Sequence, residues 1–475
     1  MKMDVQETKQ WPQYLAAITA TLSMGIAGSH IGWTSPSLPY LKSEISHLPM
    51  SNDDSSWIAS FFLLGSVPGN LLAAFIVDTI GRKLSLLLAG VPLTLGWLLI
   101  IFARNAYYLY ASRFISGFGM GIVYVVCPMY IGEIADKKIR GALGTFIKLM
   151  VTFGELYSHA VGPFTKFHEL TYACLLIPVV FFMTFIWMPE SPYYLVMKGK
   201  HQEAEDSLKT LKRYSNKNGL QEDMDQMTKA VLMDMKSRAG FRDLFMTEGN
   251  RKGLTICFGL QLILQFSGIA AIESYTQEIV APSESGLTPG ISVIILSVCQ
   301  LVAGLGAAVL VDKLGRRPLL MSTTLCAAVV LMVSSAFSIL KIELGWPLKG
   351  LGWILDSSVI LYEFIIALGL NPLPYMMLGE LFPTNVKGVA VSIANVWGSI
   401  LAFFVAKMFQ VVTDTCGMYA SFAWFAASCV LGLVFIQWFV PETKGKSLGE
   451  IQDELNCRKK VKTINQEVYI KTIDF

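Results

Sequence analysis

The sequence predicts an all-α membrane protein with twelve transmembrane helices in two six-helix repeats, joined by a cytoplasmic helical linker. Three observations predict this fold. The composition is too apolar for a soluble protein, twelve apolar stretches have membrane-spanning length, and three short motifs each occur twice in the same order. Together they place the chain in a bilayer and divide it into two related halves.

The composition excludes soluble and disordered classes of protein. Of the 475 residues, 53% are hydrophobic and 15% are charged, and the mean hydropathy is +0.52, whereas a soluble domain carries about 25% charged residues. A disordered chain needs the opposite balance of charge and hydrophobicity. The net charge of +3 provides no strong field to recruit nucleic acid, so the partner that the composition implies is the lipid bilayer.

No pattern of catalytic or metal-ligating residues is present in the sequence. The eight cysteines stand at irregular spacing inside mostly apolar runs, which matches neither a disulfide framework nor a zinc site. Paired histidine ligands, a nucleophile elbow and a phosphate-binding glycine loop are absent at credible spacing. We therefore expect no metal, no cofactor and no enzymatic activity.

Twelve apolar stretches can each cross about 30 Å of hydrocarbon at about 1.5 Å per residue. They lie near residues 14–33, 57–77, 84–103, 107–132, 141–163, 171–188, 253–272, 289–311, 318–340, 351–379, 388–411 and 418–439. The polar gap between the sixth and seventh carries apolar residues at helical spacing, which predicts short amphipathic helices. The predicted segments are therefore a six-helix bundle over 1–188, a linker over 189–252, a second bundle over 253–440 and a tail over 441–475.

The distribution of positive charge predicts the orientation in the membrane. Most of the 38 Lys and Arg residues fall on the side that holds both termini and the linker, and such residues accumulate on the cytoplasmic side. We expect both termini to be cytoplasmic. The basic tail residues Arg458, Lys459, Lys460 and Lys462 are expected to contact anionic lipid headgroups or to be disordered.

Three charged motifs occur once in each half. Asp78 with Gly81-Arg82-Lys83 recurs as Asp312 with Gly315-Arg316-Arg317, Glu133 with Arg140-Gly141 recurs as Glu380 with Lys387-Gly388, and Pro189-Glu190-Ser191-Pro192 recurs as Pro441-Glu442-Thr443-Lys444. Similar offsets, in the same order and at equivalent span ends, indicate a duplicated six-helix unit.

These motifs predict a conformational latch at the cytoplasmic mouth. Its expected members are Asp78, Arg82, Glu133, Arg140, Glu190, Arg316, Glu380, Lys387 and Glu442, which would pair across the two halves when that mouth is closed. A single partly exposed pair contributes only about 0–1 kcal/mol, so the latch requires a network. The alternative is that these charges merely follow the positive-inside rule.

The chain resembles the sugar porters of the major facilitator superfamily, which include facilitative glucose transporters and insect facilitated trehalose transporters. The resemblance covers nearly all of residues 14–455 and is closest to the trehalose branch. It is carried by the motifs above, by Arg113 with Gly117 and Gly121, by Pro128-Met129-Tyr130, by Gln265-Phe266-Ser267-Gly268 and by Glu380-Leu381-Phe382-Pro383. It implies two repeats that rock about a central cavity and move a small sugar down its gradient across the plasma membrane, as a functional monomer.

A sugar site needs amide and hydroxyl side chains together with an aromatic platform. The seventh span supplies Gln265, Ser267 and Tyr275, and the eighth supplies Gln300 at a position where the family commonly has an amide. Because an uncharged amide inside an apolar helix is costly unless it is paired, each glutamine either binds the solute or bonds to another helix.

Several positions depart from the family pattern. Leu264 and Ala270 replace amides of the seventh span, Tyr375 replaces a tryptophan of the tenth, and Asn395 and Trp397 are displaced from the family's pair in the eleventh. We still include Tyr375, Asn395 and Trp397 among the substrate-binding candidates. The prolines before Tyr375 predict a bend in the tenth span.

The fifth span carries Lys148 where the family generally has glutamine. An ammonium group inside the membrane is expensive without a nearby acid. Glu155 lies seven residues further along the same face, and Glu273 or Glu363 could reach Lys148 from the other half. Lys148 is therefore either part of a structural ion pair or a direct substrate contact.

The first span carries no carboxylate for coupling to protons. Ser29 stands where proton-driven family members have an aspartate, which predicts a uniporter. His30 leaves a proton-linked alternative open, although we interpret it as a solvated histidine at the mouth. Two further alternatives are a transporter-like sugar sensor and a porter for a different polar solute, anionic or polyol, that uses Lys148.

Overall fold

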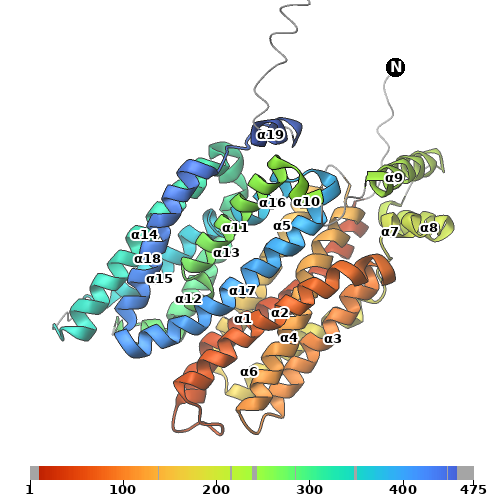
Figure 1. The fold of residues 1–475 in the computed structure, drawn as a ribbon. Helices are drawn as coiled ribbons and strands as arrows, with labels where there is room; N and C mark the ends of the chain where they lie inside the picture. The colour runs from red at the N-terminus through yellow and green to blue at the C-terminus, as the bar shows by residue number, and fades with distance from the viewer. Residues whose placement is uncertain are drawn as a thin grey trace, which may run out of the picture.

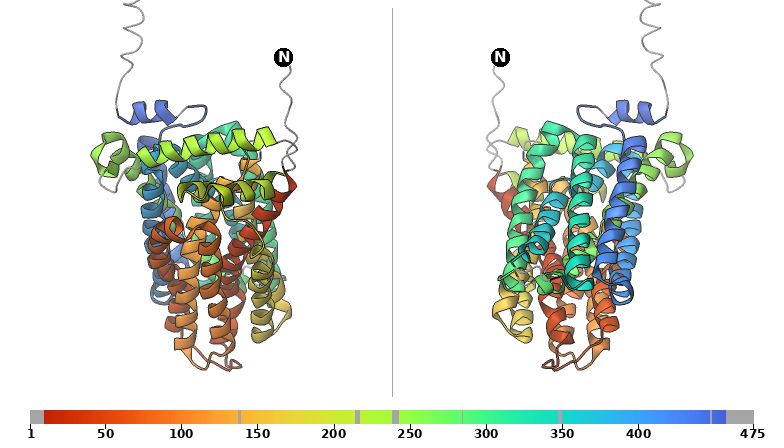
Figure 2. Two further views of the ribbon diagram at one scale, coloured as in Figure 1. Left: turned by 90° about the vertical axis from the view of Figure 1, so that its right-hand side faces the viewer. Right: turned by 90° about the vertical axis from the view of Figure 1, so that its left-hand side faces the viewer.

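The computed structural model describes residues 10–136, 139–213, 217–237, 243–283, 285–346, 350–446 and 448–456. It contains twelve membrane-length helical units (Figure 1), which confirms the predicted fold class. The linker helices, the start of α1 (Trp11–Lys42) and α19 (Leu448–Leu455) gather at one end of the bundle (Figure 2). We call this end the linker face and the opposite end the far face. The basic tail residues Arg458, Lys459, Lys460 and Lys462 lie outside the described residues.

The first half consists of α1 and five further long helices that follow the predicted spans. They are α2 (Asn52–Ile80), α3 (Arg82–Ile101), α4 (Ala106–Ile134), α5 (Arg140–Val161) and α6 (Phe167–Phe185), with the short 3₁₀ turn η1 (Gly162–Phe164) after α5. Length and apolar composition alone mark eleven units of the described chain as membrane spans, and α5 is not among them. Because α5 carries Lys148 and Glu155, its polarity indicates that it faces the interior of the bundle rather than lipid.

Glycines allow α2 and α4 to approach each other closely. Gly65 and Gly69 on α2 face Gly117 and Gly121 on α4, and a Cβ atom on any of them would lie 2.0–2.3 Å from a backbone oxygen of the other helix. Small residues spaced four apart permit such backbone contact between membrane helices. The sequence thus sets the spacing of the helices that carry one wall of the central site.

The second half repeats this arrangement, with two broken units. The seventh unit is α11 (Glu248–Phe266) followed by α12 (Ile269–Val280) and η2 (Ala281–Ser283), and the tenth is α15 (Trp353–Leu368) followed by α16 (Pro372–Leu381). The remaining units are α13 (Pro289–Leu314), α14 (Arg316–Ser338) with the π-turn η3 (Ile339–Glu343), α17 (Thr384–Cys416) and α18 (Met418–Phe439). The break before Pro372 is the bend that the prolines predict.

The two halves meet along equivalent helices. The second unit, α2, packs along the eleventh, α17, and the fifth, α5, packs along the eighth, α13, while α1 contacts α12. In the first two pairs, the second helix of one repeat packs along the fifth helix of the other, as a pseudo-twofold axis along the membrane normal requires. The central space therefore has walls from α1, α2 and α5 on one side and from α12, α13 and α17 on the other.

The linker folds as short helices on the linker face. They are α7 (Pro192–Met197), α8 (His201–Lys212), α9 (Lys217–Ser237) and α10 (Asp243–Met246). Leu195, Leu208, Met224 and Val231 form a small apolar core among them. Amphipathic helices of this kind bury one face against each other, so the linker is a folded element with its own core.

Candidate substrate site and gates

Two candidates of the seventh unit lie at its break. Gln265 is buried near the end of α11 and makes no side-chain hydrogen bond within the described part of the chain. The Ser267 hydroxyl donates to the Leu264 carbonyl at 2.7 Å and lies 3.2 Å from the hydroxyl of Tyr362. Ser267 therefore holds the break in place, whereas the Gln265 amide is available for a solute.

The Tyr275 ring has an aromatic partner but its hydroxyl has no hydrogen-bond partner among the described residues, whereas the Gln300 amide is hydrogen-bonded. The Tyr275 ring is buried and packs against Phe409, with ring centroids 5.1 Å apart. The Gln300 amide nitrogen donates to Oε1 of Glu273 at 3.3 Å. Gln300 thus orients an acid of the second half, which is the helix-to-helix bond that was one of its two expected roles.

The candidates of the tenth and eleventh units differ in availability. Tyr375 on α16 is 43% exposed, and Asn395 on α17 is half-buried. The Trp397 indole donates to the Phe258 carbonyl at 3.3 Å, and its ring lies 5.5 Å from the Phe258 ring. Trp397 therefore ties α17 to α11, and Tyr375 and Asn395 remain open to a solute.

Gln261 is a candidate that the sequence analysis missed. It lies one turn before Gln265, and its buried amide has no hydrogen-bond partner among the described residues, although it lies near the Tyr375 hydroxyl. Gly398 leaves room for it, since a Cβ there would lie 2.8 Å from Gln261 Oε1. A buried amide without a partner is costly, so Gln261 joins the candidate site. The spacing of four residues from Gln265 was the available signal.

Four charged side chains from helices of both halves lie within electrostatic range of one another. Lys148 and Glu155 come from α5, Glu273 from α12 and Glu363 from α15. Lys148 acts electrostatically on all three carboxylates. The expected ion pair is not formed, because no carboxylate among the described residues lies within 4.0 Å of the Lys148 ammonium. Two helical turns, about 10 Å, separate Lys148 from Glu155, and neither side chain closes that gap.

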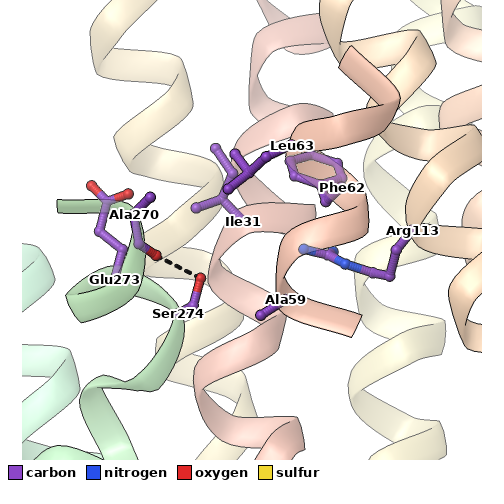
Figure 3. A pocket seen from close by; sticks show the side chains of 8 residues that line it. All are labelled: Ile31, Ala59, Phe62, Leu63, Arg113, Ala270, Glu273 and Ser274. Carbon is purple, nitrogen blue, oxygen red and sulfur yellow. Dashed lines mark hydrogen bonds between the residues drawn. The ribbon is translucent and has the colours of Figure 1, made fainter. Parts of the chain in front are cut away.

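A cavity of about 50 Å³ lies between the halves beside Glu273 (Figure 3). Its lining residues are Ile31, Ala59, Phe62, Leu63, Arg113, Ala270, Glu273 and Ser274. The Arg113 guanidinium lies 4.3 Å from the Phe62 ring centroid and donates to the backbone carbonyls of Ile58 and His30 at 3.1 and 2.6 Å. The Arg113 charge is therefore held inside the first half, and Glu273 is the ionisable lining residue of the second half.

His30 is not a solvated histidine at the mouth, so that expectation is wrong. Its side chain is fully buried, its Nε2 lies 3.0 Å from the Leu93 carbonyl oxygen, and its ring stacks on Trp97 with centroids 3.9 Å apart. The reason is that His30 faces α3 rather than the central space. The neighbouring Ser29 hydroxyl donates to the Ile26 carbonyl at 2.8 Å.

The charged motifs of the first half form one network at the linker face. Arg82 pairs with Glu133 at 2.9 Å and with Asp78 at 3.4 Å. The Glu190 carboxylate accepts the backbone N–H of Arg82 at 3.0 Å, and the Ser191 hydroxyl donates to Glu133. The start of the linker is thereby fastened to the turn between α2 and α3.

The second half builds the same network from the duplicated residues. Arg316 pairs with Glu380 at 2.9 Å and with Asp312 at 3.8 Å. Glu442 accepts the backbone N–H of Arg316 at 3.0 Å, and the Thr443 hydroxyl donates to Glu380 at 2.5 Å. Four kinds of interaction recur with equivalent partners, which supports a structural duplication as the origin of the motifs.

The turns that hold these networks also match in backbone conformation. Gly81 and Gly315 have φ of 97° and 93°, values that only glycine adopts readily. A Cβ at Gly81 would lie 2.3 Å from the Glu190 carboxylate, and one at Gly315 would lie 2.9 Å from that of Glu442. The glycines therefore permit both the turn and the close approach of the acid.

The predicted pairing across the halves is not present in this conformation. The ion pairs of Arg82 and Arg316 stay inside their own halves. Arg140 donates to the Ala135 carbonyl at 3.3 Å, and Lys387 has no ion pair among the described residues. The physical reason is proximity, since each arginine has an acid one turn away and another on the next helix. In this conformation the motifs brace each half, and pairing across the halves stays a prediction for a conformation closed at the linker face.

Direct ties between the halves lie toward the far face. Lys42 at the end of α1 pairs with Glu278 of α12 at 2.8 Å. Lys407 of α17 pairs with Asp53 of α2 at 2.6 Å, and its ammonium lies 4.0 Å from the centroid of the Trp57 ring. Further hydrogen bonds across the halves join Asn52 to Asp414, Ser66 to Ser399 and His159 to Ser297. We call the Lys42–Glu278 and Lys407–Asp53 pairs the far-face ties.

Glu442 and Lys212, which lie outside the membrane-spanning helices, have shifted pKa values. Burial would raise the pKa of Glu442, but backbone N–H groups of Lys444, Arg316 and Arg317 outweigh it and hold the pKa below its usual range. Burial would lower the pKa of Lys212, but two neighbouring acids outweigh it and raise the pKa.

The two acids beside Lys212 connect the linker to the first half. Asp136, in the loop after α4, lies 2.6 Å from the Lys212 ammonium, and Asp223 of α9 lies 2.7 Å from it. The Gln13 amide of α1 also donates to Asp136 at 2.9 Å. Lys212 therefore fastens α8 and α9 to the linker face of the first half.

Comparison with known proteins agrees with this architecture. A family model described as "Sugar (and other) transporter" matches residues 9–455. The chain belongs to the sugar transporter family. Among similar proteins, the facilitated trehalose transporter Tret1 of Bombyx mori is 32% identical over 467 residues, covering 98% of this chain and 91% of that protein. Tret1 of Aedes aegypti is 29% identical, covering 98% of this chain and 57% of that longer protein.

Solved structures show the same fold. The inward open conformation of the xylose transporter XylE from E. coli matches with a TM-score of 0.78 at 22% identity, covering 93% of this chain and 99% of that chain. Its partially occluded inward open conformation matches with a TM-score of 0.77 at 23% identity, covering 92% and 99%. This member of the sugar transporter family is thus a multi-pass membrane protein. Since its relatives are named as transporters, it is not an enzyme.

Proposed function

We propose that the chain carries a small sugar, a hexose or trehalose, across the plasma membrane as a uniporter by alternating access. The linker face is the cytoplasmic side in this proposal, with both termini on it. The naming of relatives as facilitated trehalose transporters supports the substrate class, and the accumulation of Lys and Arg on the linker side supports the orientation.

The observation that carries this proposal is the placement of the contacts between halves. The far-face ties join the halves at one end, while the networks of Arg82 and Arg316 at the other end stay within each half. The charged candidate Lys148 comes from the first half, and the amide and aromatic candidates come from the second half. Two halves that are each braced internally and are joined at the far face are expected of a carrier that is closed on that face and whose halves can rock against each other.

The amide and aromatic candidates support a sugar as the solute. Gln261, Gln265, Tyr375 and Asn395 combine amide groups with an aromatic hydroxyl, which is the chemistry that sugar hydroxyls and C–H faces require. Ser29 supports uniport, because its hydroxyl bonds within α1 and cannot carry a proton across the membrane.

The test is counterflow of radiolabelled hexoses and trehalose in proteoliposomes. We expect exchange of at least one of these sugars, and we expect Gln265→Leu to reduce its apparent affinity about tenfold, as the loss of a buried hydrogen bond does. Collapse of an inward proton gradient is expected to leave exchange unchanged. Abolished uptake after that collapse would contradict uniport.

A second candidate function is a sugar sensor or a carrier of another polar solute. Leu264 and Ala270 stand where the family has amides, and Lys148 adds a charge to the site. Binding of a sugar without any counterflow would favour the sensor. Exchange of a polyol or a charged solute in place of hexoses and trehalose would favour the alternative carrier.

A further inference from the structure

Two histidines lie in contact at the far face. His47 stands in the loop between α1 and α2, and His168 stands in the first turn of α6. Their ring centroids are 4.8 Å apart, and the Phe167 ring contacts both, at 5.3 Å from His47 and 5.4 Å from His168. The loop is therefore held against α6 by a pair of groups that can titrate near neutral pH.

His47 is fixed in place by Tyr40 of α1. Its Nδ1 lies 3.0 Å from the Tyr40 hydroxyl oxygen, and that oxygen also accepts the His47 backbone N–H at 3.4 Å. The Tyr40 hydroxyl proton can then donate to the Nδ1 lone pair, which exists only on a ring that carries no proton at that nitrogen. This arrangement favours a neutral His47.

The surroundings also favour a neutral His168. Its Nδ1 is buried and has no hydrogen-bond partner among the described residues, so a proton there would be an unsatisfied donor. Two charged imidazoles in contact would also repel each other. Burial and the neighbouring His168 lower the pKa of His47 below its ordinary value.

No acid is placed to neutralise a charged imidazole in this pair. Within the described part of the chain, no carboxylate oxygen lies within 4.0 Å of a ring nitrogen of His47 or His168. The charged side chains of the loop and of the helix ends around it are exposed or bonded to other groups; they are Lys42, Glu44, Asp53, Asp54, Lys166 and Glu169. Protonation of the pair therefore weakens the contact between the loop and α6.

The same loop has a far-face tie at each of its ends. Lys42 is the last residue of α1, and Asp53 lies in the first turn of α2. Between them the loop folds back on itself, since the Met50 N–H donates to the Leu41 carbonyl at 3.0 Å and Ser51 caps α2. A shift of the loop therefore moves both Lys42 and Asp53 relative to their partners in the second half.

We propose that the His47–His168 pair is a pH-sensitive switch of the far face, which loosens the far-face ties when the solution on that side becomes acidic. The proposal rests on the carrier function proposed above and adds a regulation to it. Proton uptake charges the pair, the rings separate, and the loop leaves its position against α6. Because the pKa of His47 is lowered while the rings are in contact, the contact is fully present above the ordinary histidine value of about 6.5 and is lost as pH falls below it.

This switch sets the rate at which the far face opens and not the direction of net transport. A proton that binds at the far face and leaves on the same side moves no charge across the membrane. Collapsing a proton gradient at constant far-side pH is therefore expected to leave sugar exchange unchanged, as for a uniporter.

The experiment measures the opening of the far face by accessibility labelling. Tyr375→Cys, in the full chain with the eight native cysteines replaced, is treated in proteoliposomes with a membrane-impermeant maleimide on the far side, at about pH 7.5 and about pH 5.5. The pH on the linker side is held constant. Arg104→Cys, at an exposed position in the turn between α3 and α4, corrects for the lower reactivity of any thiol at acidic pH.

We expect the corrected labelling rate to be about two- to fivefold higher at the acidic pH, which is the range that a partly solvated charge interaction gives. His47→Asn keeps a polar group near the Nδ1 position but does not titrate, so it is expected to abolish the acceleration. Tyr40→Phe keeps both histidines and removes the hydroxyl partner, and it is expected to raise the rate at about pH 7.5 toward the acidic value.

The matched control is His201→Gln, on the linker helix α8 at the other end of the molecule. It is expected to retain the full acceleration. Cooperative thermal unfolding of His47→Asn at about pH 7.5 shows that this variant is folded.

The outcomes distinguish this switch from the proposed function. Equal corrected rates at the two pH values, slower labelling at acidic pH, or full acceleration in His47→Asn would overturn the switch, even where sugar counterflow is robust. Because the labelling requires no substrate, a pH-dependent rate in a chain that exchanges no sugar would support the switch while contradicting sugar transport.

Discussion

Single residues set the contact between α2 and α4. At Gly117 a Cβ would lie 2.0 Å from the Phe62 carbonyl oxygen, whereas at Gly144 on α5 a Cβ meets no atom within 4 Å. We therefore expect Gly117→Val to destabilise the protein by about 1–3 kcal/mol through overpacking. Gly144→Val is the matched control, with a much smaller effect. Thermal unfolding in detergent measures both, and equal losses would contradict the packing argument.

Glu442 makes stability depend on pH in a definite direction. Its backbone donors hold the pKa of this carboxyl below the usual range in the folded protein. The stabilisation is fully present above the ordinary glutamate pKa, about 4.3, and is lost as pH falls through the lower folded value.

The matching variant is Glu442→Gln, compared with the unmodified chain. At pH 7 we expect its midpoint of thermal unfolding to be lower by a few degrees, with the difference shrinking below about pH 4. A difference that is unchanged at low pH would show that the carboxylate charge contributes nothing.

Among the helical elements, the break between α11 and α12 depends on one glycine. Gly268 has φ of 95°, and a Cβ there would lie 2.3 Å from the Phe425 ring. We expect Gly268→Ala to cost about 1–3 kcal/mol of stability and to slow counterflow, because the break would shift. Gly304→Ala on α13, where no atom lies within 4 Å of the added Cβ, is expected to leave both unchanged. Full activity of Gly268→Ala would contradict this role.

Each far-face tie is a weak ion pair, and the coupling of Lys407 with Asp53 can be tested by a double-mutant cycle. Lys407 is mostly buried while Asp53 is 71% exposed, so solvent limits their coupling to about 0.2–1 kcal/mol. A double-mutant cycle of Lys407→Gln and Asp53→Asn, read as the rate of labelling from the far face, is expected to show non-additive opening. Strictly additive effects of the two substitutions on the labelling rate would show that this ion pair does not hold the far face closed.

At the scale of the whole molecule, the apolar pattern and the duplicated motifs were sufficient to predict the fold. Apolar length locates a span without knowledge of its neighbours. The apolar stretch 141–163 located even α5, which does not meet a stricter criterion of length and apolar composition. The family resemblance was likewise confirmed by the matching family model.

The contacts of the site could not be predicted to the same degree. Nothing in the sequence distinguishes a solvated His30 from one stacked on Trp97, because the direction of a side chain on α1 depends on how α3 packs. Pairing across the halves stays a prediction for a conformation closed at the linker face. The sequence could not show that Arg82 and Glu133 pair within one half, since they are equally charged in either arrangement. Gln261 was missed because its availability depends on Gly398 of a distant helix.

Alternating exposure of the central space is tested most directly by accessibility labelling. Tyr375→Cys, in a background with the eight native cysteines replaced, is treated with a membrane-impermeant maleimide from each side of the membrane. In the protein with both far-face ties intact, we predict that the introduced cysteine is labelled from the linker side. When Lys42→Gln and Lys407→Gln remove both ties, we predict a shift toward labelling from the far side. Labelling from one side alone, in every variant and with every sugar, would contradict a carrier whose halves rock about this site.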